Sequence, residues 1–284
     1  MKKIGMIGIG LMGHGIASNI VKHGYPLTVM EHAGNQPLEG LLAQGVRTVK
    51  TPRALGAEAE VILLCVTGAP QVEAVLTGDD GLIAGLQQGT IVIDCSTSIP
   101  SATQKLAKLV AKAGGILIDA AMTRTPKEAA EGRLNLLVGS DANTFEQVQP
   151  LLSCFAENIN HMGEVGAGHQ MKLLHNYVSL GTVTVIAEAA ACAQRSGIAP
   201  ENFVDVLAKG GGWGAALERL DQGHPQVGPR DGQHHAQRQK QQGCNVLRQR
   251  GCRPKPDGQQ QQRSRMHTVH RRARRRDRKS TRLN

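Results

Sequence analysis

The glycines at positions 8, 10 and 13 have the spacing GxGxxG, which can bind the phosphates of a dinucleotide. This segment follows the apolar run Lys3–Gly8 and opens the helical pattern Leu11–His23, as that chemistry requires. Gly8 permits a tight turn, Gly10 lets the backbone approach a pyrophosphate, and Gly13 lets the helix pack close to the strand. The helix N-terminus then presents unpaired N–H groups to the phosphates. We therefore expect cofactor contacts from the whole loop, which comprises Gly8, Ile9, Gly10, Leu11, Met12 and Gly13.

An acid follows this loop at the distance expected of a ribose ligand. The second apolar run, Leu27–Glu31, ends 18 residues after Gly13. The Glu31 carboxylate can accept hydrogen bonds from both ribose hydroxyls and would repel a 2′-phosphate. The sequence therefore favours NAD as the cofactor and leaves NADP possible, since His32 weakens the preference slightly. The alternative is a glycine-rich turn without a ligand, followed by an ordinary surface glutamate.

The elements that must position this loop alternate along the chain. Further apolar runs are Glu60–Cys65, Thr90–Asp94 and Gly115–Asp119, and a helical pattern at Ser101–Ala113 separates the last two. Continuous apolar runs are typical of strands that are covered by helices on both faces. The segment up to Asp119 therefore predicts a parallel α/β sheet of the Rossmann type with right-handed crossovers.

A helical region follows the sheet. From Gly166 the pattern changes, and Met171–Ala193 reads as one long helix that ends at Gly197 and Pro200. A further helix is predicted at Pro200–Lys209. We expect three parts: a Rossmann domain over residues 1–163, a partial, truncated all-α domain over 164–220, and a tail over 221–284.

The tail has a different composition from the rest of the chain. Residues 221–284 contain 17 Lys or Arg against four Asp, a net charge of +13, whereas residues 1–220 carry −3. The tail has no aromatic residue and too few apolar side chains to offset the entropy of ordering, so we expect it to be disordered.

Two interpretations of this basic tail remain open. One is an arm that binds RNA or DNA through its phosphates. The other is a shift of the reading frame near residues 211–225, which would explain the abrupt bias toward Arg, Gln, His and Pro. The second is favoured, and nucleic acid is an unlikely partner, because the tail offers no aromatic ring on which bases could stack.

The cysteines and the apolar segments indicate a cytoplasmic protein. The six cysteines stand singly, without metal-ligand spacing, and are expected to be buried thiols; they lie at positions 65, 95, 154, 192, 244 and 252. No apolar run is long enough for a membrane span, and the N-terminus lacks a secretory signal. We expect no metal and no membrane partner.

Three motifs in a fixed order resemble the β-hydroxyacid dehydrogenases, the family of 3-hydroxyisobutyrate dehydrogenase and tartronate semialdehyde reductase. GxGxMGxxxAxNLxxxG appears at Gly8–Gly24, DxSTxxP at Asp94–Pro100, and GxGxxxKxxxN at Gly166–Asn176. The resemblance covers residues 1–220. It implies a Rossmann domain followed by a helical domain, and an oligomer.

The resemblance also implies a site. Lys172 is expected to be the catalytic residue, an ammonium that gives a proton to a carbonyl oxygen as hydride arrives, or takes one from the alcohol in the reverse direction. Asn176, one helical turn away, is expected to hold the substrate. Ser96 is assigned to the substrate, and Thr97 and Val66 to the cofactor. The alternative for Lys172 is a solvated lysine near a helix start.

One loop departs from the family pattern. Most relatives read DAPVSGG where this chain reads Asp119–Thr125, so that an arginine replaces the first glycine of SGG, as in the branch that includes sulfolactaldehyde reductase. A guanidinium suits a carboxylate or sulfonate. We expect Thr123, Arg124 and Thr125 to bind the anionic group of the substrate. The alternative is that Arg124 pairs with an acid such as Glu128.

These observations predict an NAD(P)-dependent 3-hydroxyacid dehydrogenase or reductase, which transfers hydride between NAD and a short hydroxy acid or semialdehyde. Because half of the helical domain has no counterpart here, we expect impaired activity and poor folding beyond about residue 195. The alternative function is a non-catalytic nucleotide-binding protein with a basic arm.

The histidines at positions 14, 23 and 169 are expected to lie at the surface or at helix ends.

Overall fold

The computed structural model describes residues 2–212 and 214. The chain divides into two compact units with a boundary between Ser179 and Leu180, inside helix α8 (Ala167–Arg195). The expected disordered tail lies outside the described residues, and so does the choice between a nucleic-acid arm and a shifted frame. The domain limits expected from the sequence stay predictions.

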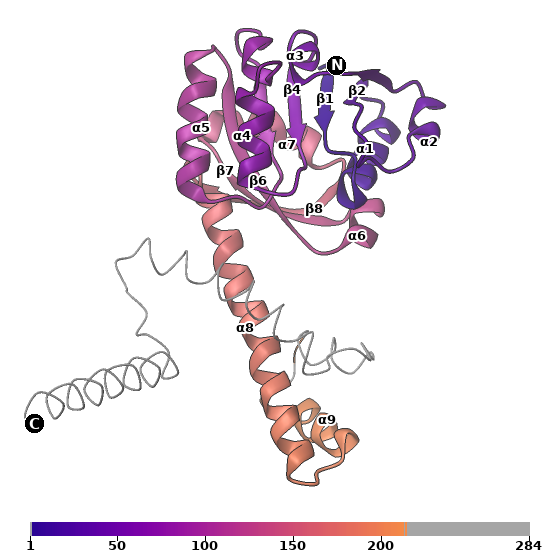
Figure 1. Cartoon of the computed structure of the whole chain (residues 1–284), viewed down its shortest axis with the longest axis vertical. Helices are drawn as coiled ribbons and strands as arrows, with labels where there is room; N and C mark the ends of the chain where they lie inside the picture. Colours follow the sequence, from indigo (N-terminus) through magenta and orange to yellow (C-terminus); the bar gives the residue numbers. More distant parts are fainter. Residues whose placement is uncertain (1, 213, 215–284) are drawn as a thin grey trace, which may run out of the picture. The chain divides into compact units, whose positions relative to one another are not determined.

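The first unit contains one eight-stranded sheet with the order β3-β2-β1-β4-β5-β6-β7-β8 (Figure 1). All neighbouring pairs from β3 to β6 are parallel, which confirms the prediction for the segment up to Asp119. Strand β7 runs antiparallel to β6 and parallel to β8. The strands are β1 (Ile4–Ile7), β2 (Leu27–Met30), β3 (Arg47–Val49), β4 (Val61–Leu64), β5 (Ile91–Asp94), β6 (Ile116–Thr123), β7 (Leu134–Gly139) and β8 (Ala156–Gly163).

Strand β6 is longer than the sequence predicted. It continues past Asp119 to Thr123 because the segment Ala120–Thr123 pairs with β7. The loop that carries Arg124 therefore begins at the end of an extended, paired strand.

Helices connect the strands, and several begin with a side-chain N-cap. Thr51, Thr125 and Asp141 each accept an amide hydrogen in the first turn of the helix that follows, as N-cap residues do. The helices of the first unit, besides the start of α8, are α1 (Leu11–Lys22), α2 (Glu39–Leu42), α3 (Pro52–Gly56), α4 (Ala69–Thr77), α5 (Pro100–Lys112), α6 (Pro126–Ala130), α7 (Ala142–Leu152) and the 3₁₀ turn η1 (Leu82–Ala84).

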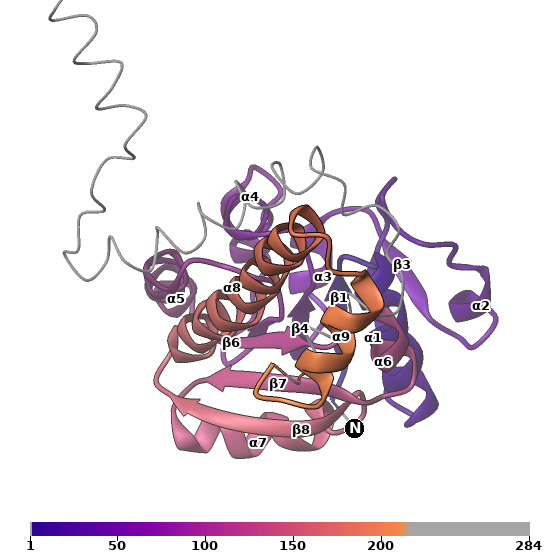
Figure 2. The same cartoon turned by 90° about the horizontal axis from the view of Figure 1, so that it is seen from below.

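Helices cover both faces of the sheet (Figures 1 and 2), and the core consists of two apolar layers, one on each face. Successive residues of a strand point to opposite faces. In β4, Leu63 packs in the layer formed with α1, α6 and α7, whereas Ile62 and Leu64 pack in the layer formed with α3, α4 and α5. Burial on both faces explains why these strands appear in the sequence as continuous apolar runs.

The second unit contributes the end of α8 and helix α9 (Pro200–Ala208), which confirms both predicted helices. Gly197 has φ +76° and ends α8, while the amide of Ile198 donates to the carbonyl oxygen of Ala193. Such a left-handed glycine satisfies the last carbonyls of a helix. Within residues 2–212 and 214, no helix is sufficiently long and apolar to cross a membrane.

Candidate active site

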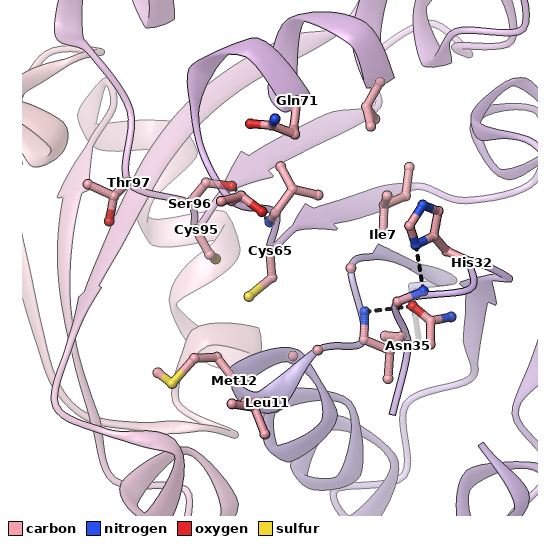
Figure 3. A pocket seen from close by; sticks show the side chains of 18 of the residues that line it. Ile7, Leu11, Met12, His32, Asn35, Cys65, Gln71, Cys95, Ser96 and Thr97 are labelled. Atoms are coloured by element: carbon pink, nitrogen blue, oxygen red, sulfur yellow. Dashed lines mark hydrogen bonds between the residues drawn. The ribbon is translucent and has the colours of Figure 1, made fainter. Parts of the chain in front are cut away.

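A cavity of about 680 Å³ lies where strands β1, β4 and β5 end (Figure 3). In the strand order, β1 has β2 on one side and β4 on the other, so the chain adds β2 and β3 on one side of β1 and the later strands on the other side. Open α/β sheets bind ligands at such a point, beyond the carboxyl ends of the strands. The lining brings together many residues predicted from the sequence, namely Gly8, Ile9, Gly10, Leu11, Met12, Gly13, Val66, Ser96, Thr97, Arg124 and Lys172.

The glycine loop forms the floor of this cavity. Gly8 has φ +95°, and a Cβ atom there would lie 2.2 Å from the carbonyl oxygen of Cys65. Only glycine fits such a turn without strain. A Cβ atom on Gly10, by contrast, would meet no heavy atom within 4 Å, because this residue borders open space. The loop therefore combines a tightly packed turn with an open backbone surface.

The start of helix α1 fits the phosphates of a dinucleotide. Its N-cap residue, Gly10, supplies no side-chain hydrogen bond, and the first turn contains no acidic residue. The amide hydrogens of this turn have no acceptor within their own helix and carry the positive end of its dipole. An anion can satisfy both, so the residues present suit NAD or NADP.

The loop after β2 was only partly predicted. Glu31 is exposed, accepts a hydrogen bond of 2.6 Å from the Thr48 hydroxyl, and is not among the residues that line the cavity. His32 and Asn35 line it instead (Figure 3). The Asn35 Oδ1 accepts the amide hydrogen of Ile9 at 3.3 Å, which ties this loop to the glycine loop. A polar residue shortly after the second strand was the only sequence signal for Asn35.

Ser96 and its neighbours form the opposite wall. The Ser96 amide donates to Asp94 Oδ1 at 2.9 Å, and the Ser96 Oγ accepts the amide hydrogen of Val66 at 3.1 Å. Cys65 and Cys95 lie beside them (Figure 3). Burial raises the pKa of Cys65 to about 12 and that of Cys95 well above its usual range, so both stay thiols and serve as apolar surface.

Lys172 enters the cavity from the second turn of α8. It is half-buried, and burial lowers the pKa of its ammonium group. Within the described part of the chain it has no ion pair. The lysine is thus partly withdrawn from solvent. Asn176 lies one turn further along, outside the cavity lining, where its Oδ1 is 3.3 Å from His175 Nδ1.

Arg124 has φ +80° and is the only non-glycine residue with a positive φ among those described. Its Nη1 donates to the Glu157 carboxylate and to the carbonyl oxygen of Arg133. The acid that pairs with it is thus Glu157 and not Glu128, which instead completes a capping box with Thr125 at the start of α6. Thr123 accepts a hydrogen bond from Asn135 at 3.1 Å. Arg124 alone of the three predicted loop residues lines the cavity.

His169 lies at a helix end, as expected, and its side chain is 0% exposed. Cys192 is exposed, whereas a buried thiol was expected. His23 agrees with its prediction, because it is exposed at the end of α1 and its Nδ1 contacts Asn19 O at 2.8 Å. Nothing in the spacing of His169 distinguished it from a surface residue.

The fold and the cavity define a nucleotide-binding oxidoreductase, and comparisons with known proteins specify it further. Residues 3–163 match the family described as the NAD binding domain of 6-phosphogluconate dehydrogenase. Residues 166–231 match the NAD-binding domain of NADP-dependent 3-hydroxyisobutyrate dehydrogenase. The chain belongs to the β-hydroxyacid dehydrogenase family, whose members use NAD or NADP.

Individual relatives are about one third identical to this chain over the residues that align. The 2-(hydroxymethyl)glutarate dehydrogenase of Eubacterium barkeri is 32% identical over 219 residues, which cover 76% of this chain and 71% of the relative. The 3-hydroxyisobutyrate dehydrogenase of Pseudomonas aeruginosa is 32% identical, with 76% and 73% covered. The Mycobacterium tuberculosis 3-hydroxyisobutyrate dehydrogenase, solved with L-serine, superimposes with a TM-score of 0.69 at 28% identity, covering 76% of this chain and 73% of that one. These relatives favour the oxidoreductase over the non-catalytic alternative.

Proposed function

We propose that this chain transfers a hydride between NAD and a short 3-hydroxy acid, with Lys172 as the proton donor and acceptor. The observation that supports this most directly is a half-buried lysine at the wall of a cavity whose floor is the glycine loop. When bound, the nicotinamide cofactor supplies or accepts the hydride. The candidate substrates are 3-hydroxyisobutyrate, tartronate semialdehyde, sulfolactaldehyde and their relatives.

Each proposed catalytic step uses a group at this wall. In the reducing direction the Lys172 ammonium donates a proton to the carbonyl oxygen, so that the oxygen becomes a hydroxyl as its carbon gains hydride. In the oxidising direction the free amine accepts the hydroxyl proton. Asn176, Ser96 and Thr97 are proposed to hold the substrate and the nicotinamide side of the cofactor, and Val66 to border the cofactor.

The anionic end of the substrate is assigned to the loop at Arg124. A guanidinium binds carboxylates and sulfonates through parallel hydrogen bonds. Arg124 lines the same cavity as Lys172, which favours one substrate bridging both. Thr123 and Thr125 are retained as substrate contacts in this proposal. Glu31 is proposed to favour NAD over NADP.

The proposal extends to the setting of the enzyme. We infer a cytoplasmic homo-oligomer without a nucleic-acid or membrane partner. Free cysteines are typical of a reducing compartment. We expect weaker activity than that of the relatives, because the sequence changes to a strongly basic composition after Leu220.

Turnover of the purified full chain tests this proposal. NAD and NADP reduction would be followed with 3-hydroxyisobutyrate, L-serine and 2-(hydroxymethyl)glutarate, and NADH oxidation with the matching semialdehydes. Lys172→Ala should abolish the rate, whereas Lys108→Ala, which removes an exposed lysine from α5, should not. If NADH binds but no acid or semialdehyde turns over, the proposal is wrong.

A further inference from the structure

A buried histidine lies between the two elements that carry the proposed catalytic groups. His169 is in the first turn of α8, three residues before Lys172, and its side chain is 0% exposed. Residues three apart on a helix are neighbours on its surface. The proposed reaction gives His169 no role, and a buried polar ring must satisfy its nitrogens.

The partners of the ring fix the position of one of its hydrogens. His169 Nε2 lies 3.0 Å from the carbonyl oxygen of Ser96. A carbonyl oxygen can only accept a hydrogen bond, so Nε2 must carry a hydrogen and donate it. This bond joins α8 directly to the segment that follows β5.

The other ring nitrogen faces a hydroxyl group. His169 Nδ1 lies 2.8 Å from Thr103 Oγ1, which is also 3.3 Å from the carbonyl oxygen of Ile99. The hydroxyl has one hydrogen. In one pattern the Thr103 hydroxyl donates to Nδ1 of a neutral ring. In the other pattern it donates to the carbonyl oxygen of Ile99, and Nδ1 carries a hydrogen that it donates to the hydroxyl oxygen. In both patterns Nε2 donates to Ser96.

Two carboxylates approach the ring from the sheet. Asp94 Oδ2 lies 3.9 Å from Nε2, and Asp119 Oδ2 lies 3.8 Å from Nδ1. Both carboxylates also accept amide hydrogens: Asp94 accepts that of Ser96 at 2.9 Å, and Asp119 accepts those of Gly166 at 2.6 Å and His169 at 2.7 Å. Burial raises the pKa of Asp119, and the nearby imidazole and these amides oppose that rise.

The network leaves Ser96 held at three points. Its amide is bound to Asp94, its hydroxyl to the amide of Val66, and its carbonyl to His169. Only the third bond comes from the helix that carries Lys172. We propose that His169 is a positioning residue that fixes the distance between the Ser96–Thr97 segment and Lys172, through its Nε2 hydrogen bond to the Ser96 carbonyl. This inference rests on the proposed role of Lys172.

Two substitutions by amide side chains distinguish the hydrogen bond of Nε2 from that of Nδ1. The side-chain amide of Gln reaches the place of Nε2, whereas that of Asn reaches the place of Nδ1. His169→Gln should therefore keep the bond to Ser96, and His169→Asn should keep only the bond to Thr103. Because a displacement of about 1 Å can cost about 100-fold in rate, we expect kcat to fall between about 10-fold and 100-fold in His169→Asn. In His169→Gln it should stay within about threefold.

The measurements distinguish positioning from stability. Thermal unfolding should change alike in the two variants, because each loses one buried hydrogen bond. Thr103→Val, which removes the other partner, should lower stability and leave kcat nearly unchanged. An equal loss of kcat in His169→Gln and His169→Asn, or a loss in Thr103→Val that matches His169→Asn, would overturn the proposal.

A measurement without turnover keeps the test independent of the proposed function. In the full wild-type chain labelled with ¹⁵N-histidine, the His169 resonances, identified by their absence in His169→Gln, should show a protonated, hydrogen-bonded Nε2. An Nε2 without a bound hydrogen would overturn the proposed hydrogen bond to the Ser96 carbonyl oxygen, even if the enzyme is active. If the wild type turns over no hydroxy acid while Nε2 is protonated, the proposed function fails and the hydrogen bond between the helix and the Ser96 segment stands.

Discussion

A Cβ atom on Gly13 would lie 1.9 Å from the carbonyl oxygen of Gly8. The first turn of α1 therefore packs directly on the turn that ends β1, and any side chain at position 13 would push them apart. The backbone of Gly10, between them, instead borders open space. The glycines of one motif thus have different physical roles, one in packing and one in leaving room for a ligand.

This difference predicts opposite effects of the same substitution. Gly13→Ala should destabilise the fold by more than about 1 kcal/mol, because the backbone oxygen of Gly8 cannot move aside cheaply. Gly10→Ala should leave thermal unfolding of the free protein nearly unchanged and weaken NADH binding about tenfold or more, since its methyl group occupies the approach to the phosphates. Calorimetry of unfolding and NADH fluorescence titration measure both effects. Equal stability losses in the two variants would contradict this assignment.

The lowered pKa of Lys172 predicts the pH dependence of the reaction. Burial disfavours the charged ammonium, so the group loses its proton below the ordinary lysine value of about 10.5. Reduction of a carbonyl needs the ammonium, so kcat/KM should fall as pH rises through this pKa. Oxidation of the alcohol needs the free amine, so its kcat/KM should rise over the same interval.

Substitution of the lysine provides the control. Lys172→Arg keeps a positive charge but cannot release its proton in this range. It should lose about 100-fold or more in kcat in both directions, in line with the usual contribution of general acid–base catalysis. NADH affinity should be retained. Profiles of wild type that share no inflection between the two directions would argue against Lys172 as the titrating group.

The position of Glu31 predicts cofactor preference. Its carboxylate is at the end of β2 and is held by the Thr48 hydroxyl at 2.6 Å. Because a 2′-phosphate near this carboxylate would be repelled, NADH should bind more tightly than NADPH. Glu31→Gln should reduce that preference by about tenfold, whereas Glu146→Gln, an exposed acid on α7, should not. Titration of both cofactors against each variant measures this, and an unchanged ratio in Glu31→Gln would exclude the role.

The parallel half of the sheet and the glycine loop were predictable because local signals carry them. Continuous apolar runs marked β1, β2, β4 and β5, and the loop motif lies directly after the first of them. The pairing of β6 with β7 was not predictable in this way. Strand β8 (Ala156–Gly163) has mostly exposed or half-buried residues, so it lacks the continuous apolar run that indicates a strand in a sequence. Its existence depends on its pairing with β7.

The site shows the same division between local and long-range information. Lys172 was found through a motif, and its partial burial could only come from the packing of α8. His169 lies in the same motif, yet its contacts with Asp94, Thr103 and Asp119 join residues 50 to 75 positions apart in the chain. The periodicity of apolar residues in a sequence does not indicate such long-range contacts. Asn35 was missed for the same reason, since its role depends on the amide of Ile9.

The ion pair between Arg124 and Glu157 predicts competition for the guanidinium. Arg124 lines the cavity, and the hydrogen bond from its guanidinium, together with its charge, lowers the pKa of Glu157, so this carboxylate stays ionised and bound to it. A substrate carboxylate must therefore share the Arg124 guanidinium with Glu157 or displace Glu157 from it. Glu157→Gln should therefore lower KM for hydroxy acids, about threefold to tenfold, with little change in kcat. Steady-state kinetics with acids of different size measures it.

Loss of the arginine should act in the opposite direction, and its backbone provides a matched pair of variants. Hydrogen bonds to charged groups contribute about 1.5–3 kcal/mol, so removal of the guanidinium should raise KM about tenfold to 100-fold. Arg124→Gly and Arg124→Ala both remove it, but only glycine adopts φ +80° freely. Arg124→Gly should thus unfold at a higher temperature than Arg124→Ala, while both have the same raised KM. If KM for anionic substrates stays at the wild-type value in both variants, Arg124 only closes its loop through Glu157 and does not bind the substrate.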